Sequence, residues 1–257
     1  METVESANTE LGKLLKSYVS TPGSTLNLTE LKNALNVLSS RQVLDVVSKV
    51  TRQSGRTALH CAANRGHLKI VTSILDMLSS EERVKLLSVQ CENRVTALYQ
   101  AAYNSHSEIA KQILDAIPQN HRCKLLGSQL ESEHTVLHLA AKRGDIQTIK
   151  YVLESVREEE RFELLKLLVN SNKTPLHRAA RYGHTESAKY MLNNLEPDQQ
   201  IQLLDQKDNS NQTPLEAALN NGHQSTVELL QQYRTAASCA ITATSGTTFY
   251  TCNVKLC

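Results

Sequence analysis

The chain contains no tryptophan and only two phenylalanines, and aromatic residues make up 4% of its 257 residues. Sandwich and barrel cores usually depend on aromatic side chains, so this composition favours helices packed closely through Ala, Leu, Ile and Val. Basic and acidic residues are nearly balanced, 28 against 26, so the overall charge gives no argument for nucleic-acid binding. No apolar run reaches the length of about 18 residues that a transmembrane helix requires, and none is predicted.

The first ten residues are acidic and lack an apolar run, so we expect no secretory signal. This favours an intracellular, cytoplasmic location, with the nucleus left open. The six cysteines form no Cys-x-x-Cys pair and have no histidines at zinc-ligand spacing. We therefore expect no metal site and no disulfide framework, and free thiols in a reducing compartment. The cysteines are Cys61, Cys91, Cys123, Cys239, Cys252 and Cys257.

A Thr-x-Leu segment returns along the chain at a constant interval of 39 residues. Five occurrences at one interval indicate an internal repeat, in which each unit is too small to bury its own apolar face and depends on its neighbours. The threonines that mark the five units are Thr57, Thr96, Thr135, Thr174 and Thr213.

Other positions repeat in the same register and have a physical interpretation. The threonine hydroxyl can cap the first amides of a short helix, and Pro175 and Pro214 stand at a first helical position that tolerates proline. An alanine five positions after each threonine lets neighbouring helices approach closely. Nine positions after the threonine stands a residue suited to ending the helix in a left-handed conformation. These residues are Gly66, Ser105, Gly144, Gly183 and Gly222.

A second helix follows in each unit, with apolar residues at helical spacing, as in the segment from Leu68 to Leu78. A pair of leucines then precedes the next threonine and indicates a buried connecting segment, for which we expect up to one extra helical turn. The pairs are Leu86-Leu87, Leu125-Leu126, Leu164-Leu165 and Leu203-Leu204.

Residues 174–184, Thr-Pro-Leu-His-Arg-Ala-Ala-Arg-Tyr-Gly-His, resemble the ankyrin-repeat signature almost letter for letter. The resemblance covers five units and implies an all-α ankyrin-repeat solenoid of stacked helix-turn-helix units. The period of 39 exceeds the usual ankyrin period of about 33, so we expect lengthened inter-repeat linkers. The Asp and Gly that usually shape the hairpin tips are mostly absent, which leaves the geometry of the tips open.

The repeat register divides the chain into four parts. We expect a partly flexible N-terminal segment over 1–26 and a divergent capping half-repeat over 27–52, since Leu28 to Leu38 matches the second helix of the first unit. The five ankyrin repeats then span 53–234. A Ser/Thr/Cys-containing tail over 235–257 breaks the pattern and lies outside the array, either disordered or as a short strand on the last unit.

Most of the nine histidines fall in repeat columns, and the ankyrin resemblance implies structural roles for them, with bonds to backbone groups across units. Cys61 shares its column with Gln100, Leu139 and Arg178, which indicates tolerated packing rather than a nucleophile. No nucleotide-binding or hydrolase motif occurs. We therefore expect neither enzymatic activity nor a cofactor. The histidines in columns are His60, His138 and His177, and His67, His106, His184 and His223.

In ankyrin proteins the first helices and the tips line a concave groove that binds a partner. The variable positions there hold cations and tyrosines and no acid, although Glu131 and Glu133 lie near the third tip. Arg and Tyr often dominate interface energies, so we predict a protein partner, with an acidic segment as the favoured ligand. The predicted binding residues are Arg56, Arg65, Tyr103, Lys142, Arg143, Lys173, Arg181 and Tyr182.

Three alternatives stay open at this point. The same basic stripe could bind anionic nucleic acid or lipid, although the stripe has no aromatic stacking platform for bases. The tail could complete an enzyme site, for which no catalytic cluster is visible. The chain could also be the ankyrin portion of a larger signalling receptor or of an effector that acts in a host cytosol.

Overall fold

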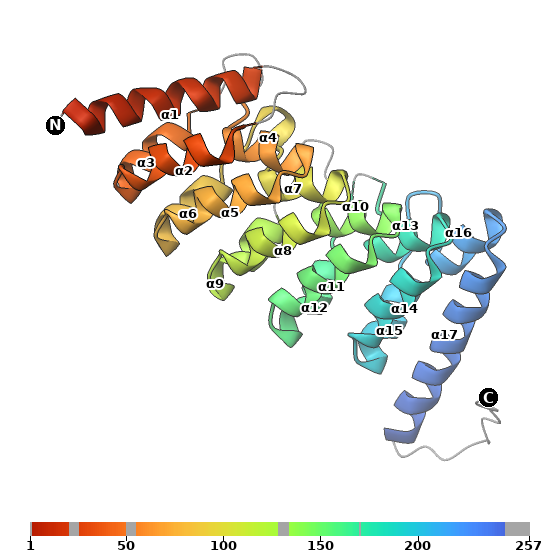
Figure 1. Cartoon of the computed structure of the whole chain (residues 1–257). Helices are drawn as coiled ribbons and strands as arrows, with labels where there is room; N and C mark the ends of the chain where they lie inside the picture. The colour runs from red at the N-terminus through yellow and green to blue at the C-terminus, as the bar shows by residue number, and fades with distance from the viewer. Residues whose placement is uncertain (1, 21–25, 50–54, 128–133, 170, 245–257) are drawn as a thin grey trace.

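The computed structural model describes residues 2–20, 26–49, 55–127, 134–169 and 171–244. Every extended regular element among these residues is a helix, and the helices stack side by side into an elongated array (Figure 1). This confirms the predicted all-α solenoid. Helix α1 lies at one end of the array and α17 at the other.

Three rows of helices run along the array (Figure 1). The row of first helices contains α4 (Ala58–Arg65), α7 (Ala97–Tyr103), α10 (Val136–Arg143), α13 (Pro175–Arg181) and α16 (Pro214–Asn220). The row of second helices contains α5 (Leu68–Asp76), α8 (Ser107–Asp115), α11 (Ile146–Ser155), α14 (Thr185–Asn193) and α17 (Gln224–Thr244). The row of third helices contains α6 (Ser80–Leu87), α9 (Gln119–Leu126), α12 (Glu158–Leu165) and α15 (Pro197–Asp205).

The repeated threonines begin the first helices as predicted. The Thr57 hydroxyl oxygen accepts a hydrogen bond from the amide of His60, and the His60 ring returns the contact to the Thr57 backbone, which forms a capping box. At the other end, the amide of Gly66 donates to the Ala62 carbonyl while Gly66 holds φ at +76°. Such a conformation is strained for any residue with a Cβ. The sequence pattern therefore sets both ends of these helices.

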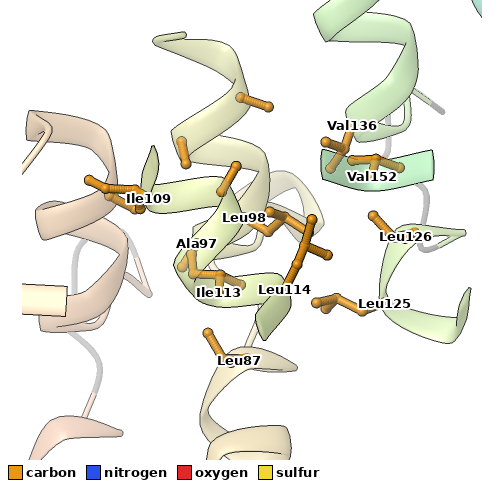
Figure 2. Packing of buried hydrophobic residues seen from close by; sticks show 14 of the residues in the cluster. Leu87, Ala97, Leu98, Ile109, Ile113, Leu114, Leu125, Leu126, Val136 and Val152 are labelled. Atoms are coloured by element: carbon orange, nitrogen blue, oxygen red, sulfur yellow. The ribbon is translucent and has the colours of Figure 1, made fainter. Parts of the chain in front are cut away.

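The connecting segment of each lengthened unit contains a third helix of eight or nine residues, which is longer than the single extra turn we expected. Ser79 caps α6 with a capping box, which explains why the helix starts there. The leucine pair lies at the end of this helix. Figure 2 shows Leu125 and Leu126 of α9 pointing toward Leu114 of α8 and Val152 of α11. Burying each leucine side chain contributes about 2 kcal/mol.

The hairpin tips keep a tight turn without the usual Asp-Gly sequence. Before the second repeat the Cys91 amide donates to the Val95 carbonyl at 2.9 Å, and the turn includes the short 3-10 helix η1 (Glu92–Arg94). Before the fourth repeat the Val169 amide donates to the Lys173 carbonyl at 3.1 Å. A residue at one repeated tip position adopts a positive φ. These residues are Gly55, Arg94, Asn172 and Asn211.

The N-terminal end is a three-helix unit made of α1 (Glu2–Ser20), α2 (Leu28–Asn36) and α3 (Ser40–Val47). Helix α1 packs on α2, α3 and α4 and lies across the end of the array, above α2 in the view of Figure 1. Leu11, Leu15 and Tyr18 are buried in this contact. The expected N-terminal segment therefore contains a long packed helix, and the expected half-repeat contains α2 and α3.

The last second helix, α17, continues to Thr244 and includes residues 235–244 of the expected tail. A helix thus stands where we expected either disorder or a strand. Ala237 is buried, and the Arg234 guanidinium lies 3.0 Å from the Asp205 carboxylate of α15. These contacts explain the extension, because α17 covers α15 as well as α14. The rest of the tail, 245–257, lies outside the described residues.

Candidate interaction surface

One histidine column joins consecutive repeats through their backbones. The Nδ1 of His138 lies 2.8 Å from the Thr135 hydroxyl, and its Nε2 lies 2.9 Å from the Lys173 carbonyl at the start of the next repeat. His60 and His177 make the equivalent contacts with Val95 and Gln212. Burial lowers the pKa of His60 to about 4 and that of His138 to about 3, so both rings are neutral at pH 7. Their role is structural, as predicted.

The second histidine column connects repeats at the C-terminal ends of the first helices. The His184 Nε2 lies 3.0 Å from the Lys142 carbonyl, and His223 makes the same contact with Arg181. The His184 ring also covers Gly144, where an added Cβ would stand 2.6 Å from its Nδ1. Glycine is thus required in this column for two reasons: the backbone is left-handed, and the imidazole of the following repeat occupies the space that a Cβ would need.

Four of the predicted binding residues come together in two cation–aromatic pairs across neighbouring repeats. The guanidinium of Arg143 lies 4.6 Å from the centre of the Tyr103 ring, and the Lys142 ammonium lies 5.9 Å from the centre of the Tyr182 ring. Tyr103 is 48% exposed and Tyr182 40% exposed. Arg181 is exposed beside Tyr182 at the end of α13. These residues form a surface, called here the first-helix surface: Tyr103, Lys142, Arg143, Arg181 and Tyr182.

The other three predicted residues are used differently. Arg65 donates a hydrogen bond to the Tyr18 carbonyl at 2.7 Å and lies over the Tyr18 ring, so α1 holds its side chain. Lys173 is mostly buried, and its ammonium lies 3.4 Å from the buried carboxylate of Asp208. Arg56 is exposed at the tip before the first repeat, whereas the two cation–aromatic pairs belong to the second, third and fourth repeats.

Asp208 corrects one part of the sequence-based argument. The predicted binding columns hold no acid, yet this tip carboxylate neutralises Lys173 from the next repeat. Hydrogen bonds from the backbone amides of Ser210 and Gln212 also hold Asp208, and together with Lys173 they keep its pKa below the usual range despite its burial. The positive surface is therefore smaller than the eight predicted residues suggest. Glu131 and Glu133 lie outside the described residues.

The sequence-based prediction missed a column that caps the second helices. Arg83 donates from Nε to the Leu75 carbonyl at 2.8 Å, and Arg161 donates to the Leu153 carbonyl at 3.0 Å. These bonds satisfy carbonyl groups that a helix end leaves without a partner. The 39-residue spacing of the column was the signal that could have revealed it. Its members are Arg83, Arg122, Arg161 and Gln200.

The predicted binding set also omits Arg178, because the variation in its column indicates tolerated packing. It is half-buried on α13, at a position where four repeats place a buried neutral residue. Its Nη2 lies 2.9 Å from the His134 Nε2, and its Nε is buried without a hydrogen-bond partner. The residues at the same position in the other repeats are Cys61, Gln100, Leu139 and Ala217.

The cysteines of the array are free but poorly suited to nucleophilic chemistry. Burial raises the pKa of Cys61 and Cys91, and burial together with Glu160 raises that of Cys123 to about 11, so these thiols stay protonated at neutral pH. Cys239 is disulfide-bonded, which differs from the expectation of free thiols throughout. Across the described ranges, no group of three or more His, Cys, Asp or Glu side chains is placed to hold a metal ion.

Comparison with known proteins agrees with the geometry. A family model described as ankyrin repeats (3 copies) matches residues 30–124, 116–202 and 155–243, which together cover most of the chain. No curated protein matches the sequence. In the part of the chain that the structure describes, no helix combines the length and apolar character needed to cross a membrane. Ankyrin repeats generally serve as protein–protein interaction modules. The chain belongs to the ankyrin-repeat family.

Proposed function

We propose that this protein is a non-catalytic adaptor that binds a partner protein through the first-helix surface. The observation that carries the proposal is where large apolar side chains are exposed. Val37, Tyr103, Tyr182 and Leu219 are the exposed large hydrophobic residues among those described, and all but Val37 belong to the first helices or their ends. Exposed apolar groups that gather on one side of a molecule are typical of a binding face.

The charges of this surface favour an acidic segment as the ligand. Lys142, Arg143 and Arg181 are exposed and stand next to the two tyrosines. Tyrosine and arginine supply large, partly rigid contact areas, and complementary charge speeds encounter with the partner and selects against basic ones. An acidic peptide that carries apolar side chains would satisfy both the cations and the exposed rings.

We also propose that the protein works inside cells and without a cofactor. The free thiols of Cys61, Cys91 and Cys123 support an intracellular location, because such thiols persist in a reducing compartment, whereas the disulfide bond of Cys239 argues against it. The histidines that could have suggested acid–base chemistry are tied to backbone groups across repeats, which leaves them no catalytic role in this reading.

Charge reversal of Arg143 and Arg181 tests the proposal. Immobilised wild-type chain and the double variant R143E/R181E would be used to capture partners from lysate, with mass spectrometry as the readout. We expect the variant to lose the partners while its helicity and melting temperature stay unchanged, because both side chains are exposed. The matched control K69E/K189E reverses the charge of two exposed lysines on second helices and should still capture the partners.

Two results would contradict the proposal. Equal capture by R143E/R181E and the control would mean that the first-helix surface is not the binding face. Loss of the captured material after nuclease treatment, together with an affinity that falls steeply with salt, would indicate a nucleic-acid ligand instead.

A further inference from the structure

We infer that Arg178 is a binding point for a side-chain carboxylate of the partner, at the junction of the third and fourth repeats. This inference rests on the proposed function and deepens it. It adds a residue outside the predicted binding set, and it assigns that residue a ligand group: the carboxylate of an Asp or Glu in an acidic segment.

The first observation is that, among the residues the structure describes, the Arg178 guanidinium has no counter-ion. Its hydrogen-bond contact is with the His134 ring at 2.9 Å, and its Nε is buried without any partner. The charged or ionisable groups that act on it are Arg181, another cation, and the phenol of Tyr182. Desolvation by burial lowers the pKa of Arg178, and no carboxylate in the described part of the chain offsets that cost. A half-buried guanidinium without an anion is costly for the folded chain.

The repeats themselves show that packing does not require a cation at this position. The equivalent residues Cys61, Gln100, Leu139 and Ala217 are neutral and buried to 8% exposure or less. The same helix geometry thus forms around a thiol, an amide, an aliphatic side chain or a methyl group. A costly charge that the fold does not need points to a ligand that supplies the missing anion.

The position of Arg178 connects it to the first-helix surface. It lies on α13 one turn before Arg181 and Tyr182, and it reaches toward His134 at the start of the third repeat. A peptide lying over Tyr103, Arg143, Lys142 and Tyr182 would therefore pass close to it. The planar guanidinium forms strong paired hydrogen bonds with a planar carboxylate, so a singly charged Asp or Glu side chain fits this single half-buried cation.

The test compares Arg178→Met with the charge-matched control Lys189→Gln on the second helix α14. Random twelve-residue peptides displayed on phage would be selected against the full wild-type chain, and enriched peptides would then be synthesised with a fluorescent label for anisotropy titration. We expect wild type and Lys189→Gln to enrich peptides with Asp or Glu at one fixed position. Arg178→Met should bind those peptides about tenfold more weakly and should lose the preference at that position.

A second readout separates a binding role from a structural one. Methionine keeps most of the volume of the side chain and removes the unpaired charge, so the melting temperature of Arg178→Met should equal or exceed that of wild type. A lower melting temperature together with unchanged peptide affinity would show that Arg178 is structural and would overturn the inference.

The remaining outcomes are also decisive. If R143E/R181E loses the peptides while Arg178→Met binds them as Lys189→Gln does, the inference fails and the proposed function stands. If wild type enriches no acidic peptide, both fail. If replacing the selected Asp or Glu by phosphoserine strengthens binding through Arg178 and the carboxylate peptide itself shows no dependence on Arg178, the ligand group is a phosphate and the assignment to a carboxylate is wrong.

Discussion

Two junctions of the array use different side chains to connect neighbouring repeats: the one between the third and fourth repeats, and the one between the second and third. Between the third and fourth repeats, His138 contacts the Lys173 carbonyl, and His184 contacts the Lys142 carbonyl and covers Gly144. The junction between the fourth and fifth repeats uses the same two kinds of contact. Two buried or half-buried imidazoles therefore connect the first helices of the C-terminal repeats.

At the junction of the second and third repeats, both histidines are replaced. Tyr99 stands in the first column and Asp145 in the second, and Ser105 replaces the glycine of the left-handed position. The three changes belong together, because a left-handed residue that no imidazole covers has room for a small side chain. Asp145 instead caps its own helix by accepting from the Thr148 amide at 3.0 Å.

Side-chain hydrogen bonds still cross this junction between helices of the second and third rows. The Arg122 guanidinium donates to the Ser155 carbonyl at 2.8 Å, and the Tyr151 hydroxyl donates to the Glu108 carboxylate at 2.9 Å. The tyrosine–glutamate bond among them recurs at the next junction, where Tyr190 donates to Glu154. Units with one shared sequence pattern therefore use different bonds at different junctions. The contact between neighbouring repeats has to be examined junction by junction, because nearest-neighbour contacts supply much of the stability of such arrays.

Gly144→Val should give the largest effect and should break the tied junction. The new side chain would meet the His184 ring, 2.6 Å from the first added carbon, and valine resists a φ of +69°. We expect a loss of roughly 3 kcal/mol from backbone strain and overpacking together. Urea unfolding followed by circular dichroism measures it.

Ser105→Val is the matched comparison at the junction without histidines. It should cost clearly less, because Ser105 already carries a Cβ and the next repeat places Asp145 rather than an imidazole there. Equal losses for the two variants would mean that the imidazole cover does not distinguish the junctions.

Acid should weaken the histidine-tied junctions at a pH where carboxylates are still ionised. The folded chain holds His60 and His138 with pKa values of about 4 and about 3, against 6.5 for an unconstrained imidazole. Their contribution is complete above pH 6.5 and declines as the pH falls toward the folded-state values, because the unfolded chain then binds protons that the folded chain does not. Urea unfolding at pH 7 and at pH 5 should show this loss.

Replacing His138 by glutamine removes one of these titrating groups and keeps a hydrogen-bonding side chain. His138→Gln should therefore reduce the difference in unfolding free energy between the two pH values, whereas the exposed His121→Gln should leave it unchanged. An identical pH dependence in wild type and His138→Gln would contradict the assignment.

Ser105→Gly should give the smallest effect, with the opposite sign. It removes the strain of a left-handed serine, whose φ is +56°, and adds flexibility to the unfolded chain, for a net gain of about 0.5 kcal/mol. The melting temperature should rise slightly. The control Ser107→Gly alters the first turn of α8, where glycine is unfavourable, and should lower it.

The sequence predicts the helix boundaries well because the caps are local. Thr57 and Gly66 act within one turn of the helix they limit, so the repeat pattern is enough to place them. The leucine pair alone predicts too short a third helix, because the start of that helix depends on the capping serine of α6 and its packing on the arginine column. The pairing of Lys173 with Asp208 depends on the distance between two successive tips, which no single unit encodes.

Arg178 is a residue whose role the sequence does not predict. Its sequence column varies freely, and that variation indicated packing without a specific role. The structure adds two facts: the guanidinium is half-buried, and no described residue supplies its counter-ion. Both depend on how the third and fourth repeats pack together.

The two longest helices have a consequence for assembly. A stack of identical units has two open faces and could lengthen without limit by adding another molecule end to end. Here α1, of 19 residues, packs over α2 and α3 at one end of the described array, and α17, of 21 residues, packs over α14 and α15 at the other. A second copy that stacked end to end on the described residues would therefore meet the outer side of one long helix rather than a three-helix unit of the repeat.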